Sequence, residues 1–168
     1  EGTLSIMVGG HESVLEKARG VLALLGRSIT YMGPVGSGQV TKAANQLIVG
    51  GTLALVAEAT VLLKKSGVDP AIALSALRGG LAGSRILDLK GPQMIEREFM
   101  PTFAAALHLK DMDIAMAVGH EAHCVLPVTA CVLQLFEAVC ACGFAEQDHS
   151  AIIKIIETLS GIEVERRN

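Results

Sequence analysis

The residue types that could do chemistry in this chain are concentrated between Gly33 and Gln46, a segment that reads GPVGSGQVTKAANQ. Lys42, Asn45 and Gln46 stand at i, i+3 and i+4, so they would share one face of a helix. An ammonium group there can donate a proton to a carbonyl oxygen and take it back in the reverse reaction, which makes Lys42 a candidate general acid and base. Asn45 and Gln46 each offer a donor and an acceptor, which suits them to hold a hydroxyl or carboxylate of a substrate.

Three glycines precede this helix, at positions 33, 36 and 38. Glycine lets the backbone approach a ligand closely, and the first N–H groups of the helix are then available to an anion. We therefore assign Gly36 and Gly38 to substrate binding together with the two amides. The alternative is an ordinary glycine turn followed by a solvated lysine, because short glycine motifs also occur by chance.

The elements that must position these residues are mostly helical. Apolar spacing predicts a strand over 3–8, a helix over 12–25 and a strand over 28–32, followed by a helix of unusual length over 38–65. Later helices are expected at 70–78, 84–89, 91–97, 103–122, 127–142 and after Asp148. The predicted fold class is thus mainly α. An all-helical domain over 33–168, built around one long central helix, follows a short β-α-β unit over 1–32.

Composition limits the partners of the chain. Of its 168 residues, 51% are hydrophobic and 18% are charged, so its helices should bury more surface than one subunit covers, and a homo-oligomer is expected. A net charge of −3 gives no basic surface for nucleic acid and no polybasic membrane anchor. The apolar run Leu47–Leu63 falls short of the roughly 20 residues that cross a bilayer, so we interpret it as a buried core helix. With no signal peptide at its start, the chain is expected in the cytoplasm.

Metal and disulfide chemistry are not expected. The four cysteines, at 124, 131, 140 and 142, form no Cys-x-x-Cys pair and are predicted to be thiols on buried helix faces. His120 and His123 lack a second pair of ligands elsewhere in the sequence. His108 is interpreted as a core or surface histidine, and His149 as part of a helix start.

The segment from Gly33 to Gln46 resembles the substrate-side motif of the β-hydroxyacid dehydrogenase family, Gly-x-x-Gly-x-Gly-x-x-x-Lys-x-x-Asn-Asn/Gln, and fills all of its fixed positions. The run LHLKDMDIAMAVG over 107–119 is similar to a second helix motif of the family. The stretches RGGLAGSRILDLKGP, LPVTACV and DHSAIIK resemble the branch that reduces tartronate semialdehyde. The resemblance covers nearly the whole chain.

The resemblance implies an oxidoreductase that reduces tartronate semialdehyde, a small-molecule substrate, to glycerate with NAD or NADP as cofactor. It implies that Lys110 reaches the cofactor near its nicotinamide. The family's Gly-x-Gly-x-x-Gly fingerprint and Ser-Gly-Gly loop do not occur here, so the chain is expected to be the C-terminal part of a longer enzyme. Most of the cofactor site would then lie in the missing N-terminal domain, and the chain alone would be nearly inactive. Alternatives are a 3-hydroxyisobutyrate or threonate-type dehydrogenase and a helical association module.

Overall fold

The computed structural model describes Gly2 and residues 4–164. The chain divides into two compact units, Glu1–Gln46 and Leu47–Asn168. The predicted fold class is confirmed, because the chain is mainly helical and its described sheet has two strands.

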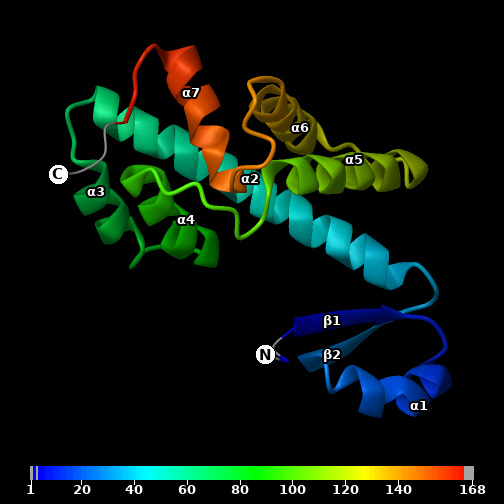
Figure 1. Ribbon diagram of the computed structural model, residues 1–168. Coiled ribbons are helices and arrows are strands. Elements are labelled where there is room, and N and C mark those ends of the chain that lie inside the picture. The colour runs from blue at the N-terminus through cyan, green and yellow to red at the C-terminus, as the bar shows by residue number, and fades with distance from the viewer. Residues whose placement is uncertain (1, 3, 165–168) are drawn as a thin grey trace. The chain divides into compact units, whose positions relative to one another are not determined.

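The first unit contains the β-α-β arrangement that the sequence predicts (Figure 1). Strands β1 (Leu4–Gly9) and β2 (Gly26–Gly33) pair in parallel, and helix α1 (Glu12–Leu22) connects them. A parallel pair requires such a crossover, since a tight turn can join only antiparallel strands. The strand predicted over 3–8 begins at a residue outside the described ones.

The predicted end of α1 is wrong by three residues. Residues 23–25 form a turn, and Gly26 begins β2 instead of ending the helix. A Cβ atom at Gly26 would lie 2.3 Å from the carbonyl oxygen of Leu4 in β1. The glycine is therefore needed where the two strands meet.

Helix α2 (Ser37–Lys65) is the predicted long central helix. Its 29 residues span about 44 Å at 1.5 Å per residue. It begins in the first unit and continues into the second. The other helical elements of the second unit are α3 (Pro70–Leu77), α4 (Arg85–Glu96), α5 (Ala105–Glu121), α6 (Pro127–Ala141), the short 3₁₀ turn η1 (His149–Ala151) and α7 (Ile152–Ser160).

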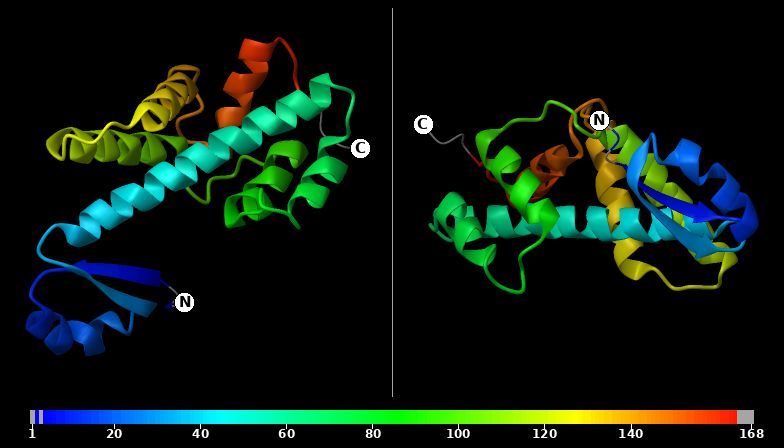
Figure 2. Two further views of the ribbon diagram at one scale, coloured as in Figure 1. Left: turned by 180° about the vertical axis from the view of Figure 1, so that it is seen from behind. Right: turned by 90° about the horizontal axis from the view of Figure 1, so that it is seen from below.

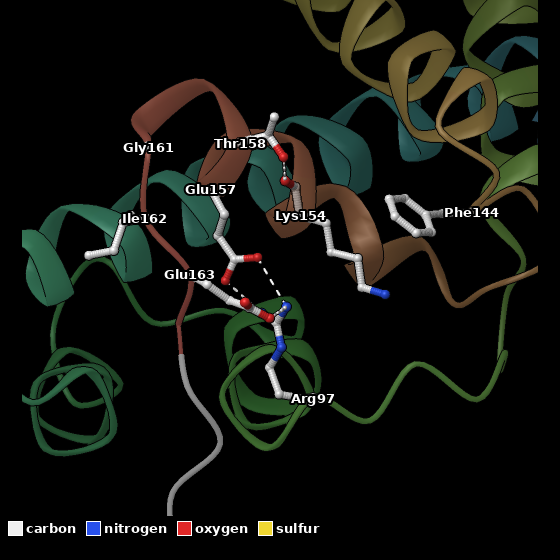
Figure 3. Close-up of a pocket in the computed structure, with 8 residues that line it drawn as sticks. All are labelled: Arg97, Phe144, Lys154, Glu157, Thr158, Gly161, Ile162 and Glu163. Atoms are coloured by element: carbon white, nitrogen blue, oxygen red, sulfur yellow. Dashed lines mark hydrogen bonds and ion pairs between the residues drawn. The ribbon is translucent and has the colours of Figure 1, made fainter.

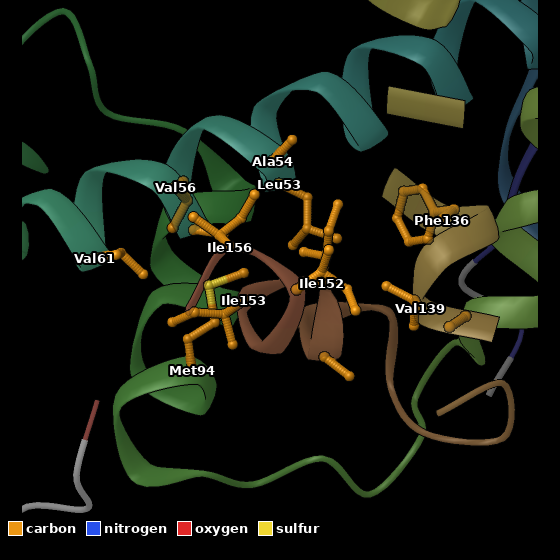
Figure 4. Close-up of a cluster of buried hydrophobic side chains, with 14 of the residues drawn as sticks. Leu53, Ala54, Val56, Val61, Met94, Phe136, Val139, Ile152, Ile153 and Ile156 are labelled. Atoms are coloured by element: carbon orange, nitrogen blue, oxygen red, sulfur yellow. The ribbon is translucent and has the colours of Figure 1, made fainter. Parts of the chain in front are cut away.

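The core of the second unit forms where these helices gather around the C-terminal part of α2 (Figures 1 and 2). The cluster includes Leu53 of α2, Phe136 of α6, Met94 of α4 and the adjacent isoleucines of α7, Ile152 and Ile153 (Figure 4). All five side chains are completely buried. Burial of this apolar surface supplies most of the stabilisation of the unit.

Helix α2 is long and apolar enough to cross a membrane, with a mean hydropathy of 1.8 over its most apolar window, 44% of which is buried inside the protein. The core helix of a globular protein passes the same test. Leu53, Ala57 and Val61 of α2 all lie in the core described above. Helix α2 is therefore a core helix, as the sequence predicts.

The sequence predicts two short helices, 84–89 and 91–97, where the structure has the single helix α4 with Pro92 inside it. Ser84 caps its start by accepting a hydrogen bond from the N–H of Leu87 at 3.0 Å. Pro92 has no N–H to donate to the carbonyl oxygen of Asp88 one turn earlier. Arg78 Nη2 donates to that carbonyl instead, at 3.5 Å, so the helix continues through the proline.

Candidate functional site

A glycine loop over residues 33–38 connects β2 to α2 in the first unit. Gly33 and Gly36 have backbone φ angles of 121° and 94°, which residues other than glycine rarely adopt. Gly38 serves another purpose, because a Cβ atom there would lie 2.6 Å from the carbonyl oxygen of Met7 in β1. The three glycines of the predicted motif thus allow the loop to turn and let α2 start against β1.

The structure brings the three predicted polar residues of α2 together. Lys42 Nζ donates to Gln46 Oε1 at 3.0 Å, and Asn45 Nδ2 donates to the same oxygen at 2.8 Å. Gln46 is buried, Asn45 is half-buried and Lys42 is exposed. An ammonium has three N–H donors. Lys42 can therefore keep its bond to Gln46 and still donate to a bound oxygen.

The predicted cofactor residue, Lys110, lies on α5 in the second unit. Its side chain is 64% exposed, and its Nζ lies 3.8 Å from Oδ1 of Asp111. An exposed ion pair at this distance contributes little free energy. The ammonium of Lys110 is therefore accessible to a phosphate, carbonyl or amide oxygen of a bound cofactor.

The second unit also contains a buried ion pair that the sequence did not predict. Lys90 Nζ lies 2.9 Å from both carboxylate oxygens of Asp148, and the two side chains are 7% and 0% exposed. Asp148 also accepts from the backbone N–H groups of Thr102 and Ser150, at 2.9 and 3.0 Å. Although burial opposes ionisation, the bonds from Lys90 and from these N–H groups hold the pKa of Asp148 well below its usual range. The sequence indicates only the capping role of Asp148.

Two histidines are buried beside this ion pair. His108 Nδ1 and His149 Nδ1 lie 2.8 Å apart, and the His108 ring stacks on Phe136 with 4.6 Å between centroids. Burial, reinforced by the neighbouring His108, lowers the pKa of His149 to about 3. The sequence prediction of a core histidine holds for His108. Spacing alone could not have paired two residues that are 41 positions apart.

A surface pocket of about 400 Å³ lies between the end of α4 and α7 (Figure 3). Its two cations have partners within the protein. Arg97 forms two hydrogen bonds to the Glu157 carboxylate, and Lys154 Nζ donates to Gln147 Oε1 at 2.8 Å while lying 4.4 Å from the ring centre of Phe144. Burial, followed by the charge of Arg97, lowers the pKa of Lys154. None of the predicted site residues lines this pocket, so we assign it no part in the chemistry.

Within the described residues, no cluster of histidine, cysteine and acidic side chains could hold a metal ion. All four cysteines are free thiols, but the prediction that they are buried is wrong, because Cys124, Cys131 and Cys142 are exposed and Cys140 is half-buried. The buried face of α6 is formed instead by Thr129, Val132, Phe136 and Val139.

Comparisons with known proteins connect this geometry to a family. A family model described as the NAD-binding domain of NADP-dependent 3-hydroxyisobutyrate dehydrogenase matches residues 36–156. A second, described as the NAD-binding domain of 6-phosphogluconate dehydrogenase, matches residues 1–33. The first match covers more than half of the chain and includes Lys42, Asn45, Gln46 and Lys110.

The curated relatives agree with these matches. The chain is 44% identical over 160 residues to 2-hydroxy-3-oxopropionate reductase of Escherichia coli, an alignment that covers 95% of this chain and 55% of that protein. It is 37% identical over 164 residues to 2-(hydroxymethyl)glutarate dehydrogenase of Eubacterium barkeri, and this alignment covers 97% of this chain and 54% of that protein. The chain therefore spans about half the length of these relatives.

Among solved structures, the 3-hydroxyisobutyrate dehydrogenase of Mycobacterium tuberculosis in complex with L-serine superposes with a TM-score of 0.86 at 28% identity. The match covers 92% of this chain and 55% of that one. Together with the family match over α2 to α7, these findings show that the chain belongs to the β-hydroxyacid dehydrogenase family.

Proposed function

We propose that this chain is the substrate-binding part of an NAD(P)H-dependent reductase and that Lys42 is its general acid and base. The observation that carries the proposal is the convergence of Lys42 Nζ and Asn45 Nδ2 on Gln46 Oε1. That bond holds the ammonium at one place on α2 while its other N–H groups stay available. The part over 33–168 would bind substrate, and residues 1–32 would be the end of a nucleotide-binding domain.

The chemistry assigned to the chain is placement of the substrate and transfer of one proton. NADH or NADPH supplies a hydride to the aldehyde carbon when bound. As negative charge develops on the carbonyl oxygen, Lys42 donates a proton to it from Nζ, and the amine later regains a proton from water. Asn45 would hold a substrate oxygen. Gln46 would both orient its two neighbours and contact the substrate. Gly36 and Gly38 would let the backbone of the loop approach the substrate carboxylate closely.

The exposed ammonium of Lys110 fits a part in holding the cofactor, because it is accessible to an electronegative group. The chain carries one helix and two strands of the proposed nucleotide-binding domain, so most cofactor contacts would come from residues outside this chain. We therefore expect the 168-residue chain alone to bind NAD(P)H weakly and to turn over little substrate.

The proposed substrate is tartronate semialdehyde, also called 2-hydroxy-3-oxopropionate, which would be reduced to glycerate. The relative from Escherichia coli, at 44% identity, supports this choice. The relative from Eubacterium barkeri supports the reaction type with another hydroxyacid. A 3-hydroxyisobutyrate or threonate-type dehydrogenase would use the same lysine and glycine loop, so it remains the alternative within the family.

A second candidate function is association of subunits. Ile48, Leu55 and Leu62 follow one another at intervals of seven residues on α2, and each is 64–67% exposed. Residues seven apart lie on one face of a helix, so these side chains form an apolar stripe, which the exposed Glu58 interrupts between Leu55 and Leu62. We propose that this stripe contributes to a homo-oligomer. The proposed place of action is the cytoplasm. Such an assembly is compatible with the reductase.

The experiment compares unchanged protein, Lys42→Ala and Lys17→Ala, each with a complete nucleotide-binding domain preceding this chain. NADH and NADPH oxidation is measured with tartronate, methylmalonate and succinate semialdehydes. We expect Lys42→Ala to lower kcat by about 10² to 10⁴, the range that a general acid contributes. Lys17 is exposed on α1, so its substitution should change nothing.

A preference for another aldehyde would keep the mechanism and change the substrate. Full activity of Lys42→Ala would contradict the reductase proposal. If that variant also kept its oligomeric size in sedimentation, the association function would stand alone.

A further inference from the structure

The buried pair of His108 and His149 has no part in the chemistry proposed above. The two side chains are 0% and 4% exposed, and their Nδ1 atoms lie 2.8 Å apart. A contact of this length between two ring nitrogens requires one N–H donor and one unprotonated acceptor. The surrounding groups indicate which ring has each role.

The carboxylate of Asp148 indicates which of the two histidines donates the hydrogen bond. Its Oδ1 lies 3.9 Å from Nε2 of His149, a buried nitrogen that makes no hydrogen bond to any described residue. A proton on Nε2 would be attracted by the negative carboxylate, whereas a lone pair there would be repelled by it. A neutral histidine with its proton on Nε2 has an unprotonated Nδ1. His149 is then the acceptor, and His108 donates from Nδ1.

This bond lies at the start of α5, the helix that carries Lys110. The backbone N–H of His149 donates to the carbonyl oxygen of Phe103 at 2.9 Å, and that of Ala105 donates to Gln147 at 2.9 Å. These backbone bonds hold the two segments side by side, and the buried residues Ala105, Met112 and Ala115 pack one face of α5 into the core. Apolar packing has little directional preference, whereas a hydrogen bond is directional, so the bond from His108 adds a specific constraint on the rotation of α5 about its own axis.

The rotation of α5 determines where Lys110 points. Successive residues of an α-helix are about 100° apart around its axis, so positions 108 and 110 face nearly opposite directions. His108 is fully buried, and the side chain of Lys110 is 64% exposed. A rotation of α5 that breaks the bond between the histidines therefore moves the Lys110 ammonium by the same angle.

We propose that His149 is a positioning residue: as the Nε2–H tautomer it accepts the Nδ1–H bond of His108, which sets the rotation of α5 together with the buried face of that helix and thereby directs Lys110 toward the cofactor. The inference rests on the proposed function, which gives Lys110 its contact with NAD(P)H. Asp148 selects the tautomer, and Lys90 holds Asp148 in place at 2.9 Å.

The first test is independent of activity. Nitrogen-15 NMR of the 168-residue chain at pH 7 reports which ring nitrogen of each histidine carries hydrogen. We expect a protonated Nε2 and an unprotonated Nδ1 for His149, and a protonated Nδ1 for His108. A protonated Nδ1 on His149 overturns the proposal.

The second test compares His149→Asn and His149→Leu in the protein with a complete nucleotide-binding domain. Asparagine can place an acceptor oxygen near the position of Nδ1, whereas leucine fills the space without an acceptor. We expect His149→Leu to raise KM for NAD(P)H about tenfold with kcat nearly unchanged, and His149→Asn to restore most of that loss. Equal KM values for the two variants overturn the proposal. If His149→Leu does not fold, a KM of His149→Asn well above that of the unchanged protein overturns it. Lys110→Ala is the matched control: a normal KM for it refutes the cofactor role of Lys110, whatever the NMR result.

Discussion

At the scale of single residues, the convergence on Gln46 Oε1 is the feature that spacing could only suggest. The interval from Lys42 to Gln46 places both side chains on one face of α2, and the structure adds that one oxygen accepts from Lys42 and from Asn45. The direction of these bonds depends on side-chain rotamers, which a spacing pattern does not contain. Gln46 therefore has a positioning part that the sequence did not reveal.

This positioning part can be tested with Gln46→Met, which keeps the length of the side chain and removes the shared acceptor. We expect kcat on tartronate semialdehyde to fall about tenfold, because Lys42 loses the bond that holds its ammonium in place. The matched control is Gln134→Met at an exposed position of α6, which should leave kcat unchanged. Equal activity of both variants would show that Lys42 is held by other groups.

A second prediction at this scale concerns adjacent glycines of α2. A Cβ atom at Gly50 would lie 2.9 Å from Nε2 of His108 and 3.1 Å from Sδ of Met112, whereas one at Gly51 would meet no described atom within 4 Å beyond its chain neighbours and the adjacent backbone of α2. Both substitutions by alanine gain helix propensity, about 1 kcal/mol each. Gly50→Ala must also displace the buried side chains of His108 and Met112, so we expect a net loss of about 1 to 2 kcal/mol. Gly51→Ala should be stabilising by about 1 kcal/mol.

Urea unfolding of the two variants gives the free energies directly. If Gly50→Ala is as stable as Gly51→Ala, the close approach of α5 to α2 in the structure is not rigid. The sequence does not distinguish these two glycines, since both lie inside the same apolar run. Only the packing of α5 against α2 separates them.

At the scale of elements, the sequence predicted the long helix, the β-α-β unit and the helix over 70–78 that is α3. Asp69 accepts from the N–H of Ala71 at 2.8 Å, and Pro70 follows at the first helical position, as the residue types indicate. Such local signals depend on neighbouring residues alone. The prediction failed at α4, where Arg78 from outside the helix compensates for Pro92 through a contact that local pattern cannot reveal.

The two prolines of α4 and α6 therefore make a matched pair. Pro92 lies inside α4 and removes a hydrogen bond to Asp88, whereas Pro127 lies at the first position of α6, where no such bond is possible. We expect Pro92→Ala to raise the free energy of unfolding by about 1 kcal/mol or more. Pro127→Ala should leave it unchanged or lower it slightly. A loss of stability in Pro92→Ala would mean that the packing of α4 requires the proline ring.

At the scale of the whole molecule, the sequence was most informative about class and least informative about buried charge. Apolar periodicity alone indicates a helical domain with a large core, because periodicity reports which faces are buried. The pairing of Lys90 with Asp148, 58 residues apart, depends on how helices pack, so it could not be read from the chain. The exposure of Cys131 in α6 was missed for a related reason, since most residues of this helix are apolar and their pattern left its buried face undefined.

The buried histidine gives the molecule a predictable sensitivity to acid. In the folded protein the pKa of His149 is lowered from 6.5 to about 3, so between these values the unfolded chain binds a proton that the folded chain does not. The stabilisation is therefore complete above pH 6.5 and is lost progressively as the pH falls toward 3. Asp148, whose pKa is also lowered, adds a further loss below its ordinary range near 3.8.

From this single histidine we expect the free energy of unfolding to fall by about 2 kcal/mol between pH 7.5 and pH 5. Urea titrations at several pH values measure the change, and His149→Asn is the control because asparagine does not titrate in this range. Between pH 7.5 and pH 5, the unfolding free energy of His149→Asn should fall by about 2 kcal/mol less than that of the unchanged protein. Parallel pH profiles for the two proteins would mean that His149 takes up its proton without unfolding, and that the buried site admits water when it does so.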